Sequence, residues 1–290
     1  MIVAATDFSP VSLNAINYAA DMACAIKTSL HLLHTHQLVM PYSSDFPVPI
    51  ENITIINQET EEKIKKLKGS LIKRVNGKIN IYTSVKEGIL VNELEDYCSS
   101  VKPYAVVMGT QGASALERVL FGSNTLAVMK HLSWPLIAVP PEAKFTGIKK
   151  IGLACDLKKV VETIPVETIR LLVKQFGAKL YIIHINSDIG GYSEYKPETM
   201  EASAFLQEML DEFNPSFHFI DITGIEEAIN GYAEAHAIDL LIIIPKKHSI
   251  AEKLMHRSRS KQLILHTQVP IMSIHESDKV YHKQPKRIPE

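Results

Sequence analysis

Short apolar segments alternate with segments of helical periodicity along the whole chain. The apolar segments are nearly continuous, which is typical of parallel strands that are buried on both faces of a sheet. The segments that we expect to form strands are Ile2–Ala5, Leu30–Thr35, Ile79–Val85, Ala105–Met108, Leu136–Val139, Ile151–Cys155, Leu180–Ile185, Phe217–Asp221, Leu240–Ile244 and Ile271–Ile274.

The segments between these strands carry apolar residues at intervals of three and four positions, as the buried face of a helix requires. In the first of them, Ala15, Ala19, Met22 and Ile26 fall on one helical face. The alternation of strand and helix is typical of βαβ units and a parallel sheet. We expect helices at Asn14–Ile26, Asn52–Val75, Leu90–Ser100, Ser123–His131, Glu162–Phe176, Thr199–Glu212, Ile225–His236 and Ser258–His266.

The two halves of the chain align as an internal repeat. Three pairs of segments match in the same order: Ile2–Asp7 with Ile151–Asp156, Leu30–His34 with Leu180–His184, and Trp134–Val139 with Val269–Ile274. The breakers Pro140, Pro141 and Gly147 mark the junction. We therefore predict two tandem α/β domains, residues 1–142 and 148–277, followed by a polar tail at 278–290. Each domain is expected to be a five-stranded parallel sheet of order 3-2-1-4-5 with helices on both faces.

Composition and charge exclude several classes of protein. The net charge is −1, so no bulk attraction to nucleic acid or to an anionic membrane is expected. The three cysteines, Cys24, Cys98 and Cys155, are widely spaced and form no CxxC, which argues against a disulfide framework or a zinc site. No apolar run approaches the ~18–20 residues that span a bilayer, and the N-terminus does not resemble a signal peptide. We therefore expect a cytoplasmic protein.

A glycine-rich pattern, G-x2-G-x9-G-S, lies between the fourth strand and the next helix of the first half. It runs from Gly109 through Gly112 to Gly122 and Ser123. Gly109 would leave room for a ligand at the strand end, Gly112 would let backbone N–H groups face inward, and the helix beginning at Ser123 would favour an anion. Thr125 would add a second hydroxyl donor. The alternative is that the glycines are ordinary turn residues and that Ser123 is a helix N-cap; we favour a phosphate-binding loop.

The predicted strand order places further residues beside this loop. In a sheet of order 3-2-1-4-5, ligands bind between strands one and four, at the carboxyl ends of the strands. Asp7 follows strand one and Gly109 follows strand four, while Thr35 ends the neighbouring strand two. A nucleoside would then lie over Ala5, Thr6, Asp7 and Thr35, with its phosphates on the glycine loop.

These residues together resemble the universal stress protein (UspA-like) family. The resemblance rests on Val3–Ser9, on the strand that ends Leu32–Thr35, and on the glycine loop, and it extends more weakly over the second half. It implies tandem flavodoxin-like domains, similar to adenine nucleotide alpha hydrolases, that bind ATP or AMP, with or without Mg²⁺. By the same resemblance Asp7 and Thr35 would contact the adenine and ribose, where Thr35 replaces the commoner valine. Met108 and Gly109 would line the nucleoside, and the phosphates would be held by Gly112, Gly122, Ser123 and Asn124.

The second half departs from the glycine pattern. Aligned back from Pro270, Gly109 becomes Pro245, Gly112 becomes about His248, and Gly122-Ser123 becomes Arg257-Ser258. A proline has no N–H to offer a phosphate and Arg257 adds a long side chain, so the backbone cradle should be lost. The basic residues of this region could form an altered anion site, but we favour a solvated loop or an interface.

A group of histidines and one aspartate also invite a chemical interpretation. His31, His34 and His36 look like metal ligands, but only His34 and His36 share a face of the strand, and no metal site is expected. Asp7 could be a phospho-acceptor, but Phe8-Ser9 follows it where such sites carry a DxDxT pattern. A role in nucleotide contact or helix capping is the better interpretation.

The last strand of each half, Leu136–Val139 and Ile271–Ile274, would be an exposed apolar edge if it were left unpaired. We predict that the two strands pair with each other or bury against the other domain, which would make the chain an intramolecular pseudo-dimer, and a homodimer of chains is plausible.

Three functions follow from these patterns. The first is an adenine-nucleotide-binding stress or regulatory protein with one competent site, in the N-terminal domain, and no catalytic activity, because no general base or metal-binding pair of carboxylates is evident. The second is an interaction scaffold that has lost nucleotide binding. The third is an ATP-dependent enzyme with slow turnover, which is disfavoured because the SGGxD and HxGH signatures are absent.

Overall fold

The computed structural model describes residues 1–37, 50–110, 122–155, 157, 160–186, 197–221, 225–245 and 268–275, and the structural statements below concern these residues. The chain divides into two compact units, Met1–Thr146 and Gly147–Glu290. Gly147 has a φ of 104°, a conformation that favours glycine, so it suits the junction. The expected helix Ser258–His266 and the polar tail at 278–290 lie outside the described residues.

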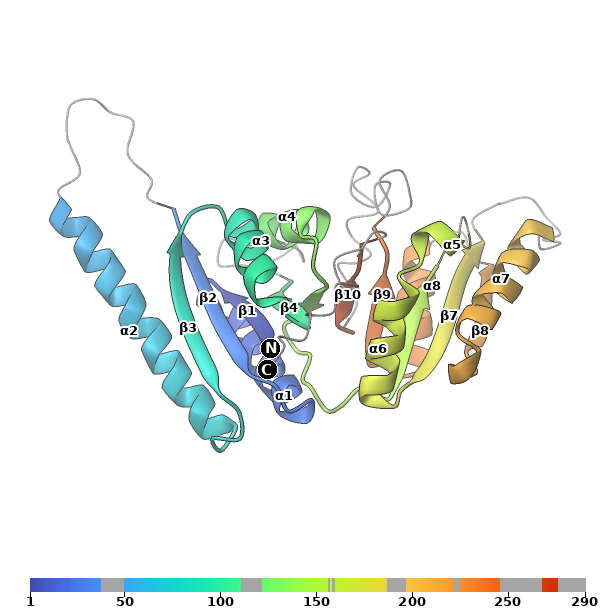
Figure 1. Ribbon diagram of the computed structural model, residues 1–290, viewed down its shortest axis with the longest axis horizontal. Helices are drawn as coiled ribbons and strands as arrows, with labels where there is room; N and C mark the ends of the chain where they lie inside the picture. Colours follow the sequence, from blue (N-terminus) through green and yellow to red (C-terminus); the bar gives the residue numbers. More distant parts are fainter. Residues whose placement is uncertain are drawn as a thin grey trace, which may run out of the picture. The chain divides into compact units, whose positions relative to one another are not determined.

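The first unit is a five-stranded parallel sheet between two layers of helices (Figure 1). Its strand order is β3-β2-β1-β4-β5, which confirms the predicted 3-2-1-4-5 arrangement. Helices α1 and α2 pack on one face and α3 and α4 on the other, as right-handed crossovers require. The elements are β1 (Ile2–Thr6), α1 (Pro10–Ala25), β2 (Leu30–His36), α2 (Ile50–Arg74), β3 (Ile81–Glu87), α3 (Leu90–Val101), β4 (Ala105–Gly109), α4 (Ser123–His131) and β5 (Leu136–Val139).

The core of this unit sits around β1 and β4. All five residues of each strand are buried, as the continuous apolar runs predicted. Residues that pair between parallel strands point to the same face, so the register sorts the side chains at the sheet's carboxyl edge. Thr6 and Gly109 face α1, whereas Ala5, Thr35 and Met108 face the layer of α3 and α4.

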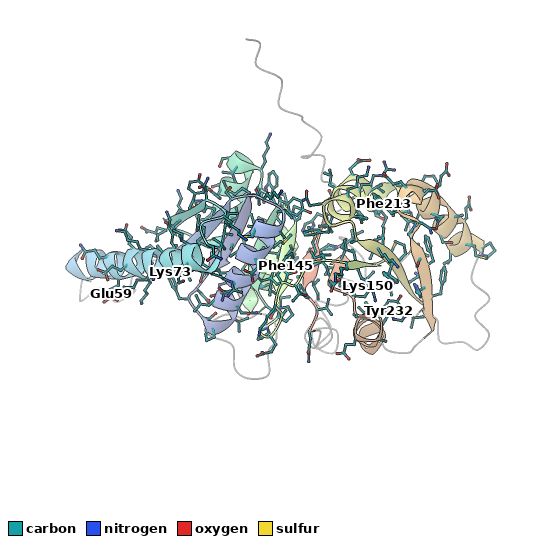
Figure 2. The ribbon with its side chains drawn as sticks, turned by 90° about the horizontal axis from the view of Figure 1, so that it is seen from below. Glu59, Lys73, Phe145, Lys150, Phe213 and Tyr232 are labelled. Atoms are coloured by element: carbon teal, nitrogen blue, oxygen red, sulfur yellow. The ribbon has the colours of Figure 1, made fainter. Side chains whose placement is uncertain are left out.

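The segment after β5 is tied back onto α1. The Asn14 side-chain amide donates hydrogen bonds to the Pro140 carbonyl at 3.0 Å and to the Ala143 carbonyl at 2.9 Å. Phe145, labelled in Figure 2, meets the Tyr18 ring edge to face with centroids 5.3 Å apart. These contacts keep the chain within the first unit up to the junction.

The second unit repeats the same topology. Its strand order is β10-β9-β6-β7-β8, which is again 3-2-1-4-5 when counted within the unit. Its elements are β6 (Lys150–Ala154), α5 (Val160–Thr163), α6 (Val166–Phe176), β7 (Lys179–Asn186), α7 (Pro197–Met209), the 3-10 turn η1 (Asp211–Phe213), β8 (Ser216–Asp221), α8 (Ile225–Ala235), β9 (Leu240–Ile243) and β10 (Ile271–Ser273).

One predicted helix was wrong in detail. The segment Glu162–Phe176 was expected to be a single helix, but α5 ends at Thr163 and α6 begins at Val166. Pro165 lies between them; it cannot donate a backbone hydrogen bond, and it disfavours the helical conformation for the residue before it. The prediction that the strands at Leu136–Val139 and Ile271–Ile274 pair concerns how the two units meet, and it stays a prediction.

Among the described residues, no helix is both long and apolar enough to cross a membrane.

Candidate functional site

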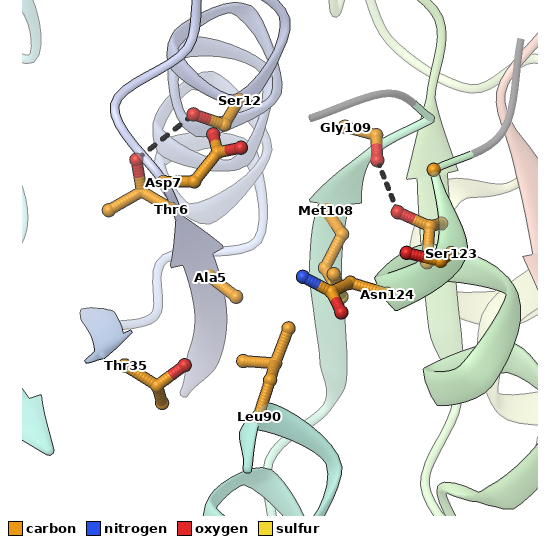
Figure 3. Close-up of a pocket in the computed structure, with 12 residues that line it drawn as sticks. Ala5, Thr6, Asp7, Ser12, Thr35, Leu90, Met108, Gly109, Ser123 and Asn124 are labelled. Atoms are coloured by element: carbon orange, nitrogen blue, oxygen red, sulfur yellow. Dashed lines mark hydrogen bonds between the residues drawn. The ribbon is translucent and has the colours of Figure 1, made fainter. Parts of the chain in front are cut away.

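A cavity lies in the first unit at the carboxyl ends of β1 and β4, where the strand order reverses (Figure 3). Its empty volume is about 610 Å³, which includes open solvent at its mouth. Six elements contribute the lining: the ends of β1, β2 and β4 and the first turns of α1, α3 and α4. The lining residues are Ala5, Thr6, Asp7, Ser12, Thr35, Leu90, Met108, Gly109, Gly122, Ser123, Asn124 and Thr125.

Every predicted site residue that the structure describes lines this cavity. Gly112 falls outside the described residues. Two lining residues were missed by the sequence analysis, Ser12 and Leu90. Ser12 lies in the first turn of α1, three residues after the helix N-cap, and Leu90 begins α3. Both could have been predicted, because helix N-termini surround the switch point, the place where the strand order reverses.

The floor of the cavity is apolar. Ala5 and Met108 are buried on adjacent strands, and Leu90 closes the floor from the start of α3. Thr35, half-buried at the end of β2, adds a hydroxyl at one side of this floor (Figure 3). A flat apolar group with a polar edge would fit such a surface better than a fully hydrated ion.

The turn from β1 to α1 supplies the polar wall. Phe8 has a φ of 62°, and side chains on both sides of it hold this uncommon backbone conformation. The Phe8 amide donates to Thr6 Oγ1 at 2.9 Å, and the Ser9 amide donates to Asp7 Oδ1 at 3.0 Å. Ser9 then caps α1 by accepting the Ser12 amide on its side chain, with Pro10 at the first helical position.

His34 supports the same turn from the neighbouring strand. Its Nδ1 lies 2.7 Å from the Thr6 carbonyl oxygen, so Nδ1 carries a proton and donates it. Burial lowers the pKa of His34 and the adjacent His36 lowers it further, although the bond to Thr6 and the charge of Asp7 act in the opposite direction. The His34 ring also packs against Phe8, with ring centroids 4.7 Å apart.

The structure shows a packing requirement for glycine at position 109 that the sequence did not reveal. A Cβ at this position would lie 3.0 Å from the backbone carbonyl carbon and oxygen of Val11 in α1. The glycine is therefore needed for the close approach of β4 to α1. That a Cβ here would also obstruct a ligand stays a prediction.

The two ends of the glycine loop are fastened together. The Gly122 amide donates to the Thr110 carbonyl at 2.8 Å, and Thr125 Oγ1 donates to the Gly109 carbonyl at 2.8 Å. The Thr125 hydroxyl is thus engaged within the protein, contrary to the expectation that it would serve a ligand. These bonds hold the start of α4 against the end of β4.

The N-terminus of α4 faces the cavity. The predicted helix Ser123–His131 is confirmed residue for residue, but the N-cap is Gly122, so Ser123 is the first helical residue. Gly122 makes no side-chain cap, and the exposed side chains of Ser123 and Asn124 reach into the cavity beside the first amides of the helix (Figure 3). This end of a helix carries a partial positive charge that favours an anion.

The histidines of β2 serve structural contacts. His31 Nε2 lies 2.8 Å from Ser84 Oγ and its Nδ1 lies 2.7 Å from the Tyr97 hydroxyl, so both ring nitrogens have partners inside the unit. Burial, together with the charge of Lys86, lowers the pKa of His31 to about 4. Within the described ranges no group of three His, Cys, Asp or Glu side chains is arranged to hold a metal ion.

The second unit keeps the histidine bond but not the glycine at the end of its fourth strand. His184 Nδ1 donates to the Cys155 carbonyl at 3.0 Å, which repeats the bond from His34 to Thr6. Leu241 pairs with Ile271 where Val106 pairs with Leu136, so Ile244 stands at the position of Gly109 and Pro245 at that of Thr110. The expected alignment of Gly109 with Pro245 was therefore wrong by one residue. The other residues compared in the two loops, Asp156, His248, Arg257 and Ser258, lie outside the described residues.

Comparison with known proteins identifies the first half. Residues 1–140 match the model of the universal stress protein family. A universal stress protein of Methanocaldococcus jannaschii is 29% identical over 148 residues, which is 49% of this chain and 83% of the relative.

Solved structures extend the likeness to both units. The structure of a universal stress protein from Archaeoglobus fulgidus covers 95% of this chain and 98% of its own, with a TM-score of 0.71 and 18% identity. A functionally unknown protein from Pseudomonas aeruginosa covers 94% of this chain and 92% of its own, with a TM-score of 0.57 and 12% identity. At these identities the likeness is one of fold.

Proposed function

We propose that the first unit, whose residues 1–140 match the universal stress protein family, binds an adenine nucleotide, ATP or AMP, as a regulatory ligand. The observation that carries the proposal is the division of one cavity into an apolar floor and a polar end that favours anions. An adenine nucleotide has the same division, because its base is flat and largely apolar, its ribose is polar and its phosphates are anionic.

The proposed pose follows from this division. The base would lie on Ala5, Met108 and Leu90, with Thr35 at its edge. The ribose would reach the Asp7 carboxylate, which hydrogen-bonds well to paired hydroxyls. The phosphates would lie at the N-terminus of α4, where helix amides and the Ser123 and Asn124 side chains can donate to them.

We propose one such site per chain. In the second unit Ile244 stands where Gly109 stands in the first and Pro245 stands where Thr110 stands, so a bulky side chain replaces the glycine and the next residue has no N–H. The second unit would then serve structure, an interface or another ligand.

We also propose that the bound nucleotide acts by its presence rather than by turnover. The described residues of the lining include one carboxylate, Asp7, and no histidine or lysine that could act as a general acid or base. The alternatives remain an interaction scaffold without a nucleotide and an ATP-dependent enzyme with slow turnover. A cytoplasmic location is proposed because none of the three cysteines forms a disulfide.

Calorimetric titration of the purified, nucleotide-free protein with ATP, ADP and AMP, each with Mg²⁺ and with EDTA, tests the proposal. Gly122→Asp places a negative charge at the start of α4 and should abolish binding. Gly69→Asp is the matched control, because it makes the same change at an exposed position of α2 with no atom within 4 Å of the new Cβ. Absence of binding at millimolar nucleotide would favour the scaffold. Steady release of phosphate from ATP would favour the enzyme.

A further inference from the structure

A chain of buried hydroxyls runs through the turn between β1 and α1. Thr6, Ser9 and Ser12 are all buried, and Thr6 Oγ1 lies 3.0 Å from Ser12 Oγ (Figure 3). The Ser12 hydroxyl donates its proton to the Ser9 carbonyl at 3.0 Å. Thr6 must therefore be the donor to Ser12, while it accepts the Phe8 amide. The hydroxyls of Thr6 and Ser12 thus each donate in one definite direction.

These buried hydroxyls belong to residues on both sides of the exposed Asp7 in the sequence. The residue before it, Thr6, is bonded to Ser12 through its hydroxyl. Ser9, whose amide donates to Asp7 Oδ1, is bonded to Ser12 through both its carbonyl and its side chain. Ser12 therefore fastens both sides of the segment that carries the carboxylate, and it lines the cavity itself.

The second unit is a natural comparison within the same molecule. Leu157 has a φ of 52° where Phe8 has 62°, so the two residues share a left-handed conformation. The Leu157 amide donates to Cys155 Sγ at 3.3 Å, a weaker acceptor than the Thr6 hydroxyl. The histidine bond to the strand-end carbonyl is also kept.

The hydroxyl chain is missing from the second unit. When the alignment of Ile2–Asp7 with Ile151–Asp156 is continued, the residues at the three positions are Cys155, Lys158 and Val161. Leu157 therefore adopts its left-handed conformation without the hydroxyls, so that conformation at Phe8 does not explain them in the first unit. In the first unit they lie beside the cavity, which Thr6 and Ser12 line.

We propose that Ser12 is a positioning residue that holds the Asp7 carboxylate in the orientation used by the ligand of the cavity. The inference rests on the proposed function and assigns Ser12 a part in it. Ser12 acts through Asp7 and need not touch the ligand.

A double-mutant cycle on ATP binding tests this role. Ser12→Ala removes the link to Thr6, and the Ser9 carbonyl keeps its bond from the Leu13 amide at 2.9 Å. We expect Ser12→Ala to weaken ATP binding about tenfold in the wild-type background and less than about twofold when Asp7 is already alanine. Ser70→Ala is the control, because Ser70 Oγ also donates to a carbonyl three residues earlier, that of Leu67, on the exposed side of α2.

Hydrogen exchange of the nucleotide-free protein gives an independent readout. The Ser9 amide donates to Asp7, so its exchange rate reports how firmly the carboxylate is held. Ser12→Ala should accelerate exchange at Ser9 about fivefold or more, whereas Ser70→Ala should leave it unchanged.

The outcomes separate the two proposals. Equal losses of ATP affinity in both backgrounds, or unchanged exchange at Ser9, would overturn the positioning role even if ATP binds. If the wild type binds no ATP, the proposed function fails, and exchange at Ser9 still decides whether Ser12 holds Asp7.

Discussion

Replacing Gly109 with alanine should destabilise the first unit, because the new methyl group has no room. The added Cβ would lie 3.0 Å from the carbonyl carbon, the carbonyl oxygen and Cγ1 of Val11. Carbon atoms normally approach to about 3.5–4.0 Å, so α1 would have to move by several tenths of an ångström. Its first turn is held by the bonds of Thr6, Ser9 and Ser12, and it cannot shift without straining them.

The expected loss in the free energy of unfolding is about 1–2 kcal/mol. Overpacking of this kind typically costs about 1–3 kcal/mol, and the stiffer unfolded chain of an alanine variant returns about 0.4–1 kcal/mol. Gly152 in β6 provides the matched comparison. A Cβ there would meet the side-chain methyl groups of Ile183, Leu241 and Ile238 at 3.0–3.4 Å, which can turn aside, so Gly152→Ala should cost less than about 1 kcal/mol.

The single tryptophan makes the measurement specific to one unit. Trp134 is buried in the first unit, so its fluorescence in urea follows the unfolding of that unit, while far-UV circular dichroism follows both. Gly109→Ala should lower the urea midpoint seen by fluorescence, and Gly152→Ala should leave that midpoint nearly unchanged. A Gly109→Ala midpoint equal to that of the wild type would refute the packing argument for this glycine.

Three further predictions concern the same unit. His31 has a pKa lowered to about 4 in the fold, below the ordinary value of 6.5, so the unfolded chain binds its proton first as the pH falls. Stability should be fully present above about pH 6.5 and decrease by up to about 3 kcal/mol towards pH 4 on this account, and urea titrations followed by Trp134 should show a smaller decrease for His31→Gln. Thr125→Val removes the buried bond to the Gly109 carbonyl and should cost about 1 kcal/mol in the same assay, and an unchanged midpoint would show that the bond is not needed to hold α4. Leu90→Asp puts a charge into the apolar floor and should weaken adenine nucleotide binding at least about tenfold by calorimetry, whereas unaltered affinity would place the base elsewhere.

Much of the fold follows from local patterns in the sequence. The continuous apolar runs gave strands whose observed ends differ from the predicted ones by one or two residues, and the repeat gave the same strand order in both units. The error at Pro165 arose because helical periodicity continues across the break. Pro165 ends the helical hydrogen bonding at this point even though the apolar pattern continues.

The site was harder to predict than the fold. The switch-point rule correctly brought Asp7, Thr35 and Gly109 to one cavity, because it depends only on strand order. The rule could not show that Gly109 packs against Val11 or that the Thr125 hydroxyl donates to the Gly109 carbonyl. Both facts depend on which face of its strand or helix each residue occupies. The hydroxyl chain through Ser12 likewise depends on directions that sequence spacing does not reveal.

Counting the nucleotides bound per chain tests the central claim most directly. Native mass spectrometry of the full chain, saturated with ATP or AMP, should show one adenine nucleotide per chain, and Gly122→Asp should reduce this to none while Gly69→Asp keeps it at one. A wild-type chain that binds no adenine nucleotide, or one that binds two, would contradict a single competent site in the first unit.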